Sequence, residues 1–386
     1  MRYSRKLGSL LVALALAGCT DADNHPGPPV AAKETLVYFG THGDKPGEEI
    51  FGAWFDERTG TLRGIGSVAD IFRPTWLVAH PDKPILFSVS ESGNDGKSEG
   101  RIVSFLVDRS TGKLQQISDA GAGGGGTTHL DFDRRSSSIV AANFGSGSAT
   151  VLPVSAEGRL GTVAGIGQDA GTGPKPRQSK PHAHAVAVDP TGRYVLVPDL
   201  GADRTFIYRL DPRTRALRPA GQPFVQAPAG SGPRHIVFSP DGRFAYVDTE
   251  LSAQIIVYRW HADVGRLEQV QLIDAAAAGS AGERSAAEIA LTRDGEFLYV
   301  SLREGEDSVV AYRRDKTSGK LTEIQRVSTG RKPWSFSLSP REKWLLVTEE
   351  ADNRISVFKR DTITGFLSAT GSELAIPRPV NVTFVR

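Results

Sequence analysis

Short apolar runs that alternate with polar positions recur along the chain from about residue 35, and the alternation follows the period of two expected for β-strands. In one instance, Val186 to Val188 is followed by an Asp-Pro-Thr-Gly-Arg bend and then by the run from Tyr194 to Val197. Segments with this pattern of strand, tight bend and apolar or aromatic strand are residues 77–89, 130–140, 186–197, 236–247, 289–300 and 336–347. Each segment predicts a β-hairpin.

A polar signal lies between these hairpins: Asp, two residues, Thr or Ser, Gly, any residue and Leu. It occurs at residues 56–62, 108–114, 315–321 and 361–367, at 211–217 with the Gly replaced, and in a shorter form at 156–160 and 263–267. We expect the Asp side chain to cap a turn, the Gly to adopt a positive φ, and the Leu to begin the returning strand. Seven such turns at a period of roughly fifty residues are typical of a propeller or solenoid.

Six hairpins against seven turns leave one hairpin to be supplied by the two ends of the repeat. Residues 378–384 predict its first strand, and residues 36–40 predict its second. Pairing one C-terminal strand with three N-terminal strands would close the ring without free sheet edges. The sequence therefore predicts an all-β fold over residues 35–386, a seven-bladed β-propeller of four-stranded blades closed by the C-terminal strand.

Composition agrees with one turn-rich domain. The chain has 386 residues with 42 Gly and 23 Pro, and no long linker interrupts the repeat. The formal net charge is only +2, and no basic stripe with interleaved aromatic residues is present, so we expect no nucleic-acid partner. We also expect a monomer.

The first nineteen residues predict a signal peptide. A basic segment with Arg2, Arg5 and Lys6 precedes the apolar run of residues 10–16, which is too short to span a bilayer. The run ends in Leu-Ala-Gly-Cys19, which resembles a bacterial lipobox, and this resemblance implies lipidation of Cys19. An ordinary secretory peptide with a chance Cys is the alternative. Because Cys19 is the only Cys, the chain can form no intramolecular disulfide.

A lipidated Cys19 would place the protein in the cell envelope, facing the periplasm, with the lipid anchor as its only membrane contact. Residues 20–34, with three prolines, predict an extended tether between the anchor and the propeller. Thr20, rather than Asp, follows the Cys, which favours the outer membrane over the inner membrane.

Propeller geometry predicts where charged residues meet. In every blade the innermost strand starts and the antiparallel second strand ends at the same end of the ring. Second-strand ends supply Glu91, Asn143, Asp199, Glu250, Arg303 and Glu350, and first-strand starts supply Arg73, His129, His182, His184, Arg234, His235, Glu288, Lys332 and Arg378. Carboxylates and imidazoles move protons and Arg stabilises oxyanions, so this rim suits a small anionic or polyol ligand and acid–base chemistry. Asn143, Asp199, His235 and Glu288 are our candidates for substrate binding.

Five ordered motifs on this rim carry a family resemblance. They are Pro-His-Ala-His at 181–184, Val-Pro-Asp-Leu-Gly-Ala-Asp at 197–203, Gly-Pro-Arg-His at 232–235, Asp-Thr-Glu-Leu-Ser at 248–252, and residues 294–303. Together they resemble the seven-bladed propeller lactonases, the family of bacterial 6-phosphogluconolactonase and fungal carboxy-muconate cyclase, from about residue 35 to the end. The resemblance implies a catalytic set of His182 or His184, Arg234, Glu250 and Arg303. Thr249 and Leu302 stand where the family usually has Asn, and Phe144 follows Asn143 in place of a Tyr.

We therefore expect a metal-independent and cofactor-free lactonase that hydrolyses a small sugar-type lactone, with Glu250 or a channel His activating water. A lactone-forming cyclase or isomerase using the same groups, and a non-catalytic envelope scaffold, remain alternatives. Two further alternatives concern the residues themselves. His182 and His184 could form a two-His metal site, although no third ligand at metal spacing is present. Arg234 and Glu250 could be a structural ion pair.

Overall fold

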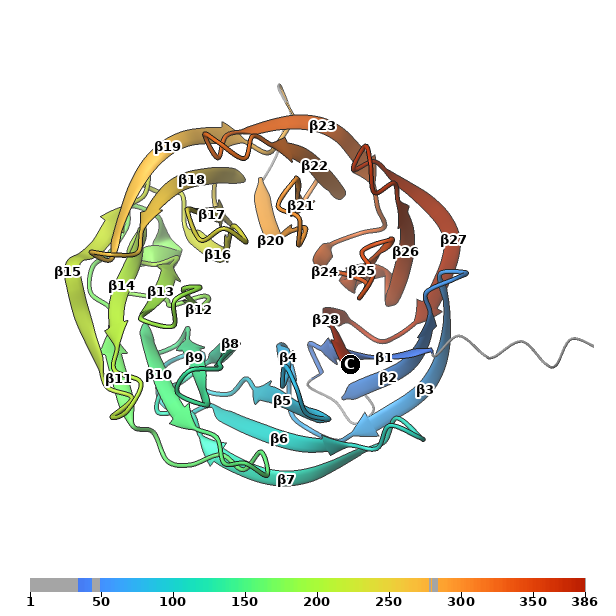
Figure 1. Cartoon of the computed structure of the whole chain (residues 1–386), viewed down its shortest axis with the longest axis horizontal. Coiled ribbons are helices and arrows are strands. Elements are labelled where there is room, and N and C mark those ends of the chain that lie inside the picture. The colour runs from blue at the N-terminus through green and yellow to red at the C-terminus, as the bar shows by residue number, and fades with distance from the viewer. Residues whose placement is uncertain (1–33, 44–48, 278, 280–283, 386) are drawn as a thin grey trace, which may run out of the picture. The chain divides into compact units, whose positions relative to one another are not determined.

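The computed structural model describes residues 34–43, 49–277, 279 and 284–385. Within these residues the chain forms seven four-stranded antiparallel sheets arranged in a ring, as Figure 1 shows with the colour running once around it. The predicted signal peptide, Cys19 and the tether before Glu34 lie outside the described residues. No helix in the described part is long and apolar enough to cross a membrane.

Each blade is named here from its innermost to its outermost strand. Blade 1 is β28 (Pro379–Val385), β1 (Thr35–Thr41), β2 (Ile50–Asp56) and β3 (Thr61–Ala69); blade 2 is β4 (Leu77–Ala79), β5 (Ile85–Ser90), β6 (Arg101–Val107) and β7 (Leu114–Gly121). Blade 3 is β8 (Thr127–Asp133), β9 (Ser138–Asn143), β10 (Ser148–Pro153) and β11 (Gly165–Gln168); blade 4 is β12 (Ala187–Val188), β13 (Tyr194–Asp199), β14 (Arg204–Leu210) and β15 (Leu217–Gln226).

Blade 5 is β16 (Pro233–Phe238), β17 (Phe244–Thr249), β18 (Gln254–His261) and β19 (Arg266–Asp274). Blade 6 is β20 (Ser285–Leu291), β21 (Phe297–Arg303), β22 (Ser308–Arg314) and β23 (Leu321–Ser328), and blade 7 is β24 (Pro333–Leu338), β25 (Trp344–Glu349), β26 (Arg354–Arg360) and β27 (Leu367–Ala375). Two short 3₁₀ helices, η1 (Pro176–Gln178) and η2 (Glu350–Asp352), lie in the connections.

The Asp-containing turns join the third and fourth strands of their blades, as predicted. In the turn of blade 2, Asp108 Oδ1 accepts the Ser110 N–H at 2.8 Å, and Gly112 adopts a φ of 73°. In blade 4, where the Gly is replaced, Arg215 itself adopts a φ of 63°. The side-chain cap therefore maintains the turn even where a non-glycine residue occupies the left-handed region.

The turns also link neighbouring blades. The hydroxyl of Tyr246 in blade 5 donates to the carbonyl of Gly319 in the turn of blade 6 at 2.9 Å, and Tyr299 donates to Gly365 of blade 7 at 2.7 Å. A Cβ at Gly319 would lie only 2.3 Å from the Phe244 ring, so this turn packs against the preceding blade without room for a side chain. The repeated Gly thus serves blade packing as well as turn geometry.

The hydrophobic core is divided into seven clusters, each between two adjacent blades. The cluster between blades 7 and 1 joins Val382 and Phe384 of β28 and Phe39 of β1 to Leu346 of β25. Strand β28 pairs with β1 over the register Leu36↔Val385 to Thr41↔Pro379. The predicted closure by the C-terminal strand is therefore confirmed, and the ring is held by the same contacts at its junction as elsewhere.

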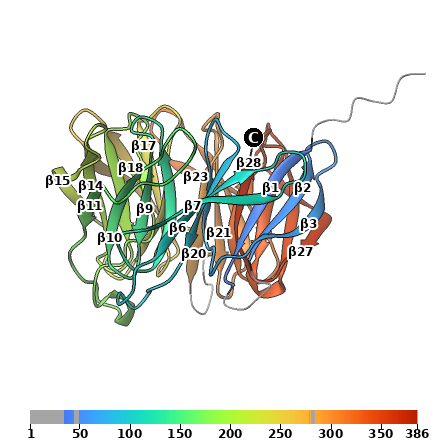
Figure 2. The same cartoon turned by 90° about the horizontal axis from the view of Figure 1, so that it is seen from below.

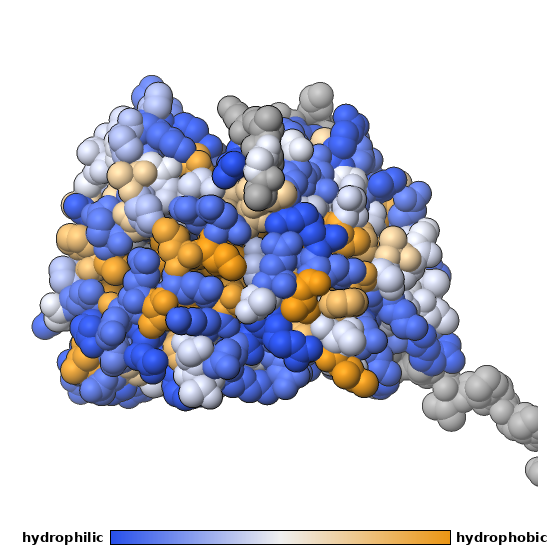
Figure 3. Space-filling view, turned by 90° about the horizontal axis from the view of Figure 1, so that it is seen from above, coloured by the Kyte–Doolittle hydropathy of each residue, from blue (hydrophilic) through white to orange (hydrophobic). Residues whose placement is uncertain are grey.

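Strand direction defines two ends of the propeller. The starts of the innermost strands and the ends of the second strands lie at one end, called the rim here, and the strand 3 to strand 4 turns lie at the other, called the base. Figure 2 shows the blades edge-on, with the C-terminal end of β28 at the base along the upper edge. On the side wall in Figure 3, hydrophilic residues predominate and apolar residues are scattered among them.

Candidate active site

Two register positions, each repeated once per blade, build the rim. On the innermost strands, one position holds Trp76, His129, His184, His235, Glu288, Ser335 and Asn381. Each of these residues pairs with a residue of the second strand of its blade. Two residues after that pairing partner, the second strands hold His42, Glu91, Phe144, Leu200, Glu250, Arg303 and Glu350. The first set is called the floor layer here, because its members contact one another across the channel.

A recurring β-bulge lies at the start of the innermost strands. In blades 1, 3, 5, 6 and 7 the pairing register shifts there by one residue. The shift in blade 5 falls at Arg234 and the shift in blade 7 falls at Trp334. A bulge redirects a side chain out of the regular alternation. Arg234 and Trp334 both line the rim cavity, beside floor-layer residues from the same strands.

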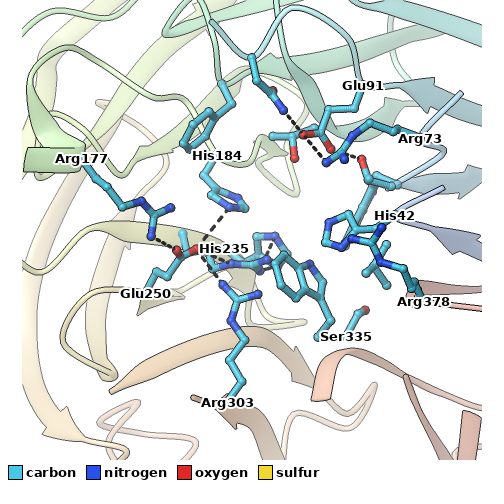
Figure 4. Close-up of a pocket in the computed structure, with 18 residues that line it drawn as sticks. His42, Arg73, Glu91, Arg177, His184, His235, Glu250, Arg303, Ser335 and Arg378 are labelled. Carbon is cyan, nitrogen blue, oxygen red and sulfur yellow. Dashed lines mark hydrogen bonds and ion pairs between the residues drawn. The ribbon is translucent and has the colours of Figure 1, made fainter. Parts of the chain in front are cut away.

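The rim cavity has a volume of about 310 Å³, at the lower end of the range typical of small-molecule sites. Six of its lining residues are Arg, His or Glu side chains from blades 4, 5 and 6 or the connection before blade 4, and others come from blades 7, 1 and 2 across the channel (Figure 4). The residues that line it are His42, Arg73, Thr75, Trp76, Glu91, Asn94, Thr128, Phe144, Arg177, His184, Arg234, His235, Glu250, Arg303, Trp334, Ser335, Arg378 and Val380.

Glu250 is the centre of a buried charged group on one side of the cavity. Its Oε2 lies 3.1 Å from Arg234 Nε and 3.1 Å from Arg303 Nη2, and its Oε1 lies 2.8 Å from Arg177 Nη1. Although burial opposes ionisation, Arg303 and Arg234 hold the pKa of Glu250 far below its usual range. The carboxylate is therefore ionised at any physiological pH and is a weak base. Glu250, Arg177, Arg234, Arg303 and His184 are called the Glu250 cluster below.

Arg303 keeps one donor uncommitted. Its guanidinium lies 3.7 Å above the Trp334 ring, and its Nε donates to Ser285 Oγ at 3.1 Å. Among the described residues, its buried Nη1 has no hydrogen-bond partner. Burial lowers the pKa of Arg303 to about 10, so the side chain stays a cation at neutral pH. An unpaired guanidinium donor beside a cavity is suited to bind an oxygen that gains negative charge.

His184 is the neutral member of the Glu250 cluster. Its Nε2 lies 3.6 Å from Glu250 Oε2, and its buried Nδ1 has no hydrogen-bond partner among the described residues. Burial, aided by Arg234, lowers the pKa of His184 well below 6.5. At neutral pH the imidazole is therefore uncharged, with a lone pair able to accept a proton.

His235 connects Arg234 to a second carboxyl group. Arg234 Nη1, which can only donate, lies 2.9 Å from His235 Nε2, so the ring proton resides on Nδ1 and is donated to Glu288 Oε1 at 3.0 Å. Glu288 Oε2 in turn accepts from the Ser335 hydroxyl at 2.9 Å. Burial raises the pKa of Glu288 to about 7 and lowers that of His235 well below 6.5. These contacts from Ser335 through Glu288 and His235 fix the orientation of the Arg234 side chain.

A second charged group faces the Glu250 cluster across the cavity. Glu350 Oε1 lies 3.1 Å from Arg378 Nε and 3.5 Å from His42 Nδ1. Glu91 accepts from Thr75 Oγ1 at 2.5 Å and lies 3.6 Å from Arg73 Nη2. His42 and Arg378 hold the pKa of Glu350 down to about 2. Glu350, Glu91, His42, Arg73 and Arg378 are called the Glu350 cluster. Figure 4 shows its members Glu91, His42, Arg73 and Arg378 across the cavity from Glu250, whereas Glu350 contacts His42 and Arg378 without lining the cavity.

The structure brings together four of the five residues that the sequence placed in catalysis: His184, Arg234, Glu250 and Arg303. His182 does not line the cavity, because its ring stacks on Phe144 at 4.3 Å and its Nδ1 contacts the Phe144 carbonyl. Of the candidates for substrate binding, His235 lines the cavity and Glu288 lies directly behind it.

Asn143 and Asp199 also lie outside the cavity lining, and strand alternation explains why. Asn143 stands one residue before Phe144, and its buried side chain bonds to Thr127 and Thr150 within its blade. Asp199 stands one residue before Leu200, and its Oδ1 accepts the backbone N–H of His182 at 2.8 Å. Burial raises the pKa of Asp199 to about 6. Both side chains point to the opposite face of the strand from Glu250 and Arg303.

Sequence reasoning missed several lining residues. Arg177 reaches Glu250 from η1, a segment without strand periodicity, so no repeat pointed to it. Trp76 and Trp334 could have been found, because both follow a cation–Pro pair at a first-strand start, as in Arg73-Pro74-Thr75-Trp76. Arg73, Glu91, Glu350 and Arg378 were predicted for the rim, but not as site residues.

Two further observations bound the site. Within the described part of the chain, no group of three or more His, Cys, Asp or Glu side chains is arranged to hold a metal ion. Below the floor layer, Trp76 and His129 also line a second, mainly apolar cavity of about 550 Å³ at the base mouth of the channel. The two rings stack at 4.1 Å, so the floor layer lies between the two mouths.

Comparison with known proteins gives consistent matches over the propeller. The model of the family described as lactonase, 7-bladed beta-propeller, matches residues 36–384. The 6-phosphogluconolactonase of Bacillus subtilis is 31% identical over 351 residues, which cover 91% of this chain and 98% of that protein. Among solved structures, the periplasmic gluconolactonase of Pseudomonas aeruginosa is 35% identical with a TM-score of 0.86, covering 91% of this chain and 99% of that one. A putative 6-phosphogluconolactonase from Bacteroides fragilis is 30% identical with a TM-score of 0.85, covering 93% and 100%.

Proposed function

Since the chain belongs to the family of seven-bladed β-propeller lactonases, we propose that it hydrolyses a small sugar-type lactone in the rim cavity. The observation that carries this proposal is the juxtaposition of a neutral His184 and an unpaired Arg303 donor beside Glu250. Hydrolysis of a lactone needs a base for water and a cation for the carbonyl oxygen, and this arrangement supplies both.

His184 is a better base than Glu250. A carboxylate bound by three guanidiniums has too low a pKa to take a proton from water, whereas a neutral imidazole can do so. Glu250 then stabilises the imidazolium that forms, because its Oε2 lies 3.6 Å from His184 Nε2. Its negative charge also offsets the positive charge of Arg234 and Arg303, which would otherwise disfavour a cationic His184.

The reaction proceeds through a tetrahedral intermediate. Water adds to the carbonyl carbon while His184 takes one of its protons, and the carbonyl oxygen becomes an oxyanion held by Arg303 Nη1. The bond between the carbonyl carbon and the ring oxygen then breaks. The imidazolium of His184 returns its proton to the departing ring oxygen, and the product is the open-chain hydroxy acid. Trp76, Trp334 and Phe144 offer apolar surface to the sugar ring.

We infer an unphosphorylated lactone as substrate, because a sugar phosphate made in the cytoplasm would not normally reach an envelope lipoprotein. The periplasmic gluconolactonase among the similar structures supports this choice.

The envelope location itself is proposed from the lipobox-like residues up to Cys19. Replacing Cys19 by Ser should abolish acyl labelling and move most of the protein out of the membrane fraction. Pairing of β28 with β1 closes the ring within one chain, and we propose a monomer.

The test is a titration of acid release from gluconolactone and from its 6-phosphate by the purified protein. Identification of the products distinguishes ring opening from ring closure, and it therefore also tests a cyclase or isomerase activity. The matched control for Arg303→Ala is Lys332→Ala, which removes a rim cation that does not line the cavity. Loss of activity in both variants, or in neither, would contradict the proposed site.

A further inference from the structure

The base of the propeller is the end from which the described chain begins. Strand β1 is the second strand of blade 1, so it starts at the base, where Thr35 pairs with Phe55 beside the turn between β2 and β3. All strand 3 to strand 4 turns lie at this end, including residues 361–367 between β26 and β27, called the Ile363 turn here. The catalytic rim is at the opposite end.

The Ile363 turn differs from the other copies of its own repeat. Its Ile363 side chain is 80% exposed and its Phe366 side chain is 47% exposed. In the four other full copies, the position of Ile363 is occupied by Arg58, Ser110, Arg213 and Thr317, and that of Phe366 by Thr61, Lys113, Ala216 and Lys320. The repeat thus shows that the turn fold does not require apolar residues at these positions. Blade 7 alone presents two large ones in this turn.

The backbone holds these side chains outward. Asp361 Oδ1 accepts the N–H groups of Ile363 at 2.8 Å and Thr364 at 3.0 Å, and Gly365 adopts a φ of 80°. The turn therefore has the same geometry as its polar counterparts, such as the Asp315 turn, in which Asp315 accepts from Thr317 at 2.9 Å. Exposure of Ile363 follows from a well-formed turn rather than from poor packing.

Cations surround the exposed tip. A groove of about 600 Å³ runs beside Ile363, and the exposed Arg341, Lys343 and Lys359 line it. Arg58 also lines the groove, but its Nη2 lies 3.1 Å from Asp56 Oδ2. The two carboxylates of the groove have partners within the protein. Glu57 accepts from the Ser339 hydroxyl and from the Arg341 N–H, each at 3.1 Å, and Asp361 caps the turn. Apolar tips set among cations bind the interface of anionic bilayers, where lipid headgroups attract the charge and acyl chains receive the apolar groups.

We propose that the Ile363 turn inserts into the surface of an anionic phospholipid bilayer, with Arg341, Lys343 and Lys359 contacting the headgroup phosphates. The predicted tether of residues 20–34 would reach at most about 50 Å from an acylated Cys19, so the base is held close to the membrane. The turn is then a second membrane contact beyond the acyl anchor, and it orients the rim cavity away from the bilayer.

The test compares two labelled positions in the full-length protein. Ile363→Cys and the matched control Thr317→Cys, at the same position of the blade 6 turn, each carry an environment-sensitive fluorophore. Both proteins are reconstituted into vesicles of phosphatidylethanolamine and phosphatidylglycerol that contain spin-labelled lipid. The expected result is a blue-shifted and strongly quenched emission at position 363 only, and weaker quenching when Lys343 and Lys359 are replaced by Glu.

Two outcomes would overturn the proposal. Equal quenching at positions 363 and 317 would show that the domain tumbles freely on its tether. A blue shift at position 363 that depends on protein concentration and needs no vesicles would show that a second copy of the chain covers the turn. As an independent measurement, Ile363→Ser with Phe366→Ser in a Cys19→Ser background should lower vesicle binding at least tenfold relative to Cys19→Ser alone. Unchanged binding would also contradict the proposal.

Discussion

Glu250 and Glu350 occupy the same register position in blades 5 and 7, yet their surroundings differ. The Glu250 side chain is 5% exposed and pairs with Arg234 and Arg303, which are 2% and 5% exposed. The Glu350 side chain is 11% exposed, and its partner Arg378 is 37% exposed. Charges removed from water interact more strongly than charges that water screens. We propose that the Glu250 cluster performs the chemistry and that the Glu350 cluster, through its cavity-lining members, binds and orients the substrate.

Opening the ring should have the largest effect on the protein. Deleting residues 378–386 removes Arg378 and strand β28, on which the Glu350 cluster and the junction of blades 7 and 1 depend. We expect loss of cooperative thermal unfolding, because the inner edge of β1 and one hydrophobic cluster become exposed. Calorimetry of the truncated protein checks this, with deletion of Arg386 alone as the control. A truncated protein with the full melting temperature would contradict the closure.

Exchange of the two carboxylates for amides should separate the clusters. Glu250→Gln should lower kcat by about 10²-fold or more, since the imidazolium of His184 loses its counter-charge. Glu350→Gln should change kcat by less than about fivefold and act mainly on KM. Steady-state kinetics measures both, and an unchanged melting temperature excludes unfolding as the cause. Equal losses of kcat in the two variants would refute the division of roles.

Replacing one arginine in each cluster should also separate the roles of the two clusters. Arg303→Ala should cost about 10²-fold in kcat, the usual scale for loss of one oxyanion donor. Arg378→Ala should raise KM about tenfold and leave kcat nearly unchanged, because a cation that binds substrate and transition state equally affects binding alone. If Arg378→Ala lowered kcat as much as Arg303→Ala, the oxyanion would have to lie on the Glu350 side.

A smaller effect is expected on the pH profile. Because the pKa of His184 is lowered and its neutral form is the base, kcat/KM should fall with acid only below the ordinary His pKa of 6.5. The charge of Glu250 raises the pKa of His184, so Glu250→Gln should move this acid limb to lower pH in its residual activity. Glu350→Gln should leave the limb in place. A limb that moved to higher pH in Glu250→Gln would exclude His184 as the base.

Much of the fold could be predicted because each blade repeats the same pattern of strands and turns. Asp108 and Asp361 cap turns that differ in sequence, and the alternating strands between them define the sheets. The ring closure followed from one missing hairpin. The number and order of the blades were therefore accessible without any structural information.

The site was accessible only where the repeat and the strand register agreed. Glu250 and Arg303 stand at equivalent positions, and the sequence placed both on the rim. Asn143 was placed there too, although it is one residue out of register with Glu250 and faces its own blade. Arg234, to which the Gly-Pro-Arg-His motif pointed, lines the cavity at a bulge. Arg177 reaches the cavity from a 3₁₀ turn, which has no periodic signature. Long-range packing decides these positions.

The closure of the ring has a consequence in time. Strand β1 is among the first parts of the propeller to be synthesised, but its inner partner β28 ends at Val385, one residue before the end of the chain. At a translation rate of about 5–20 residues per second, synthesis from β1 to β28 takes roughly 20–70 s, and one edge of β1 has no partner during this time. During that interval the nascent chain presents a strand that any neighbouring polypeptide could extend. The propeller is therefore most exposed to misassembly until β28 is available to pair with β1.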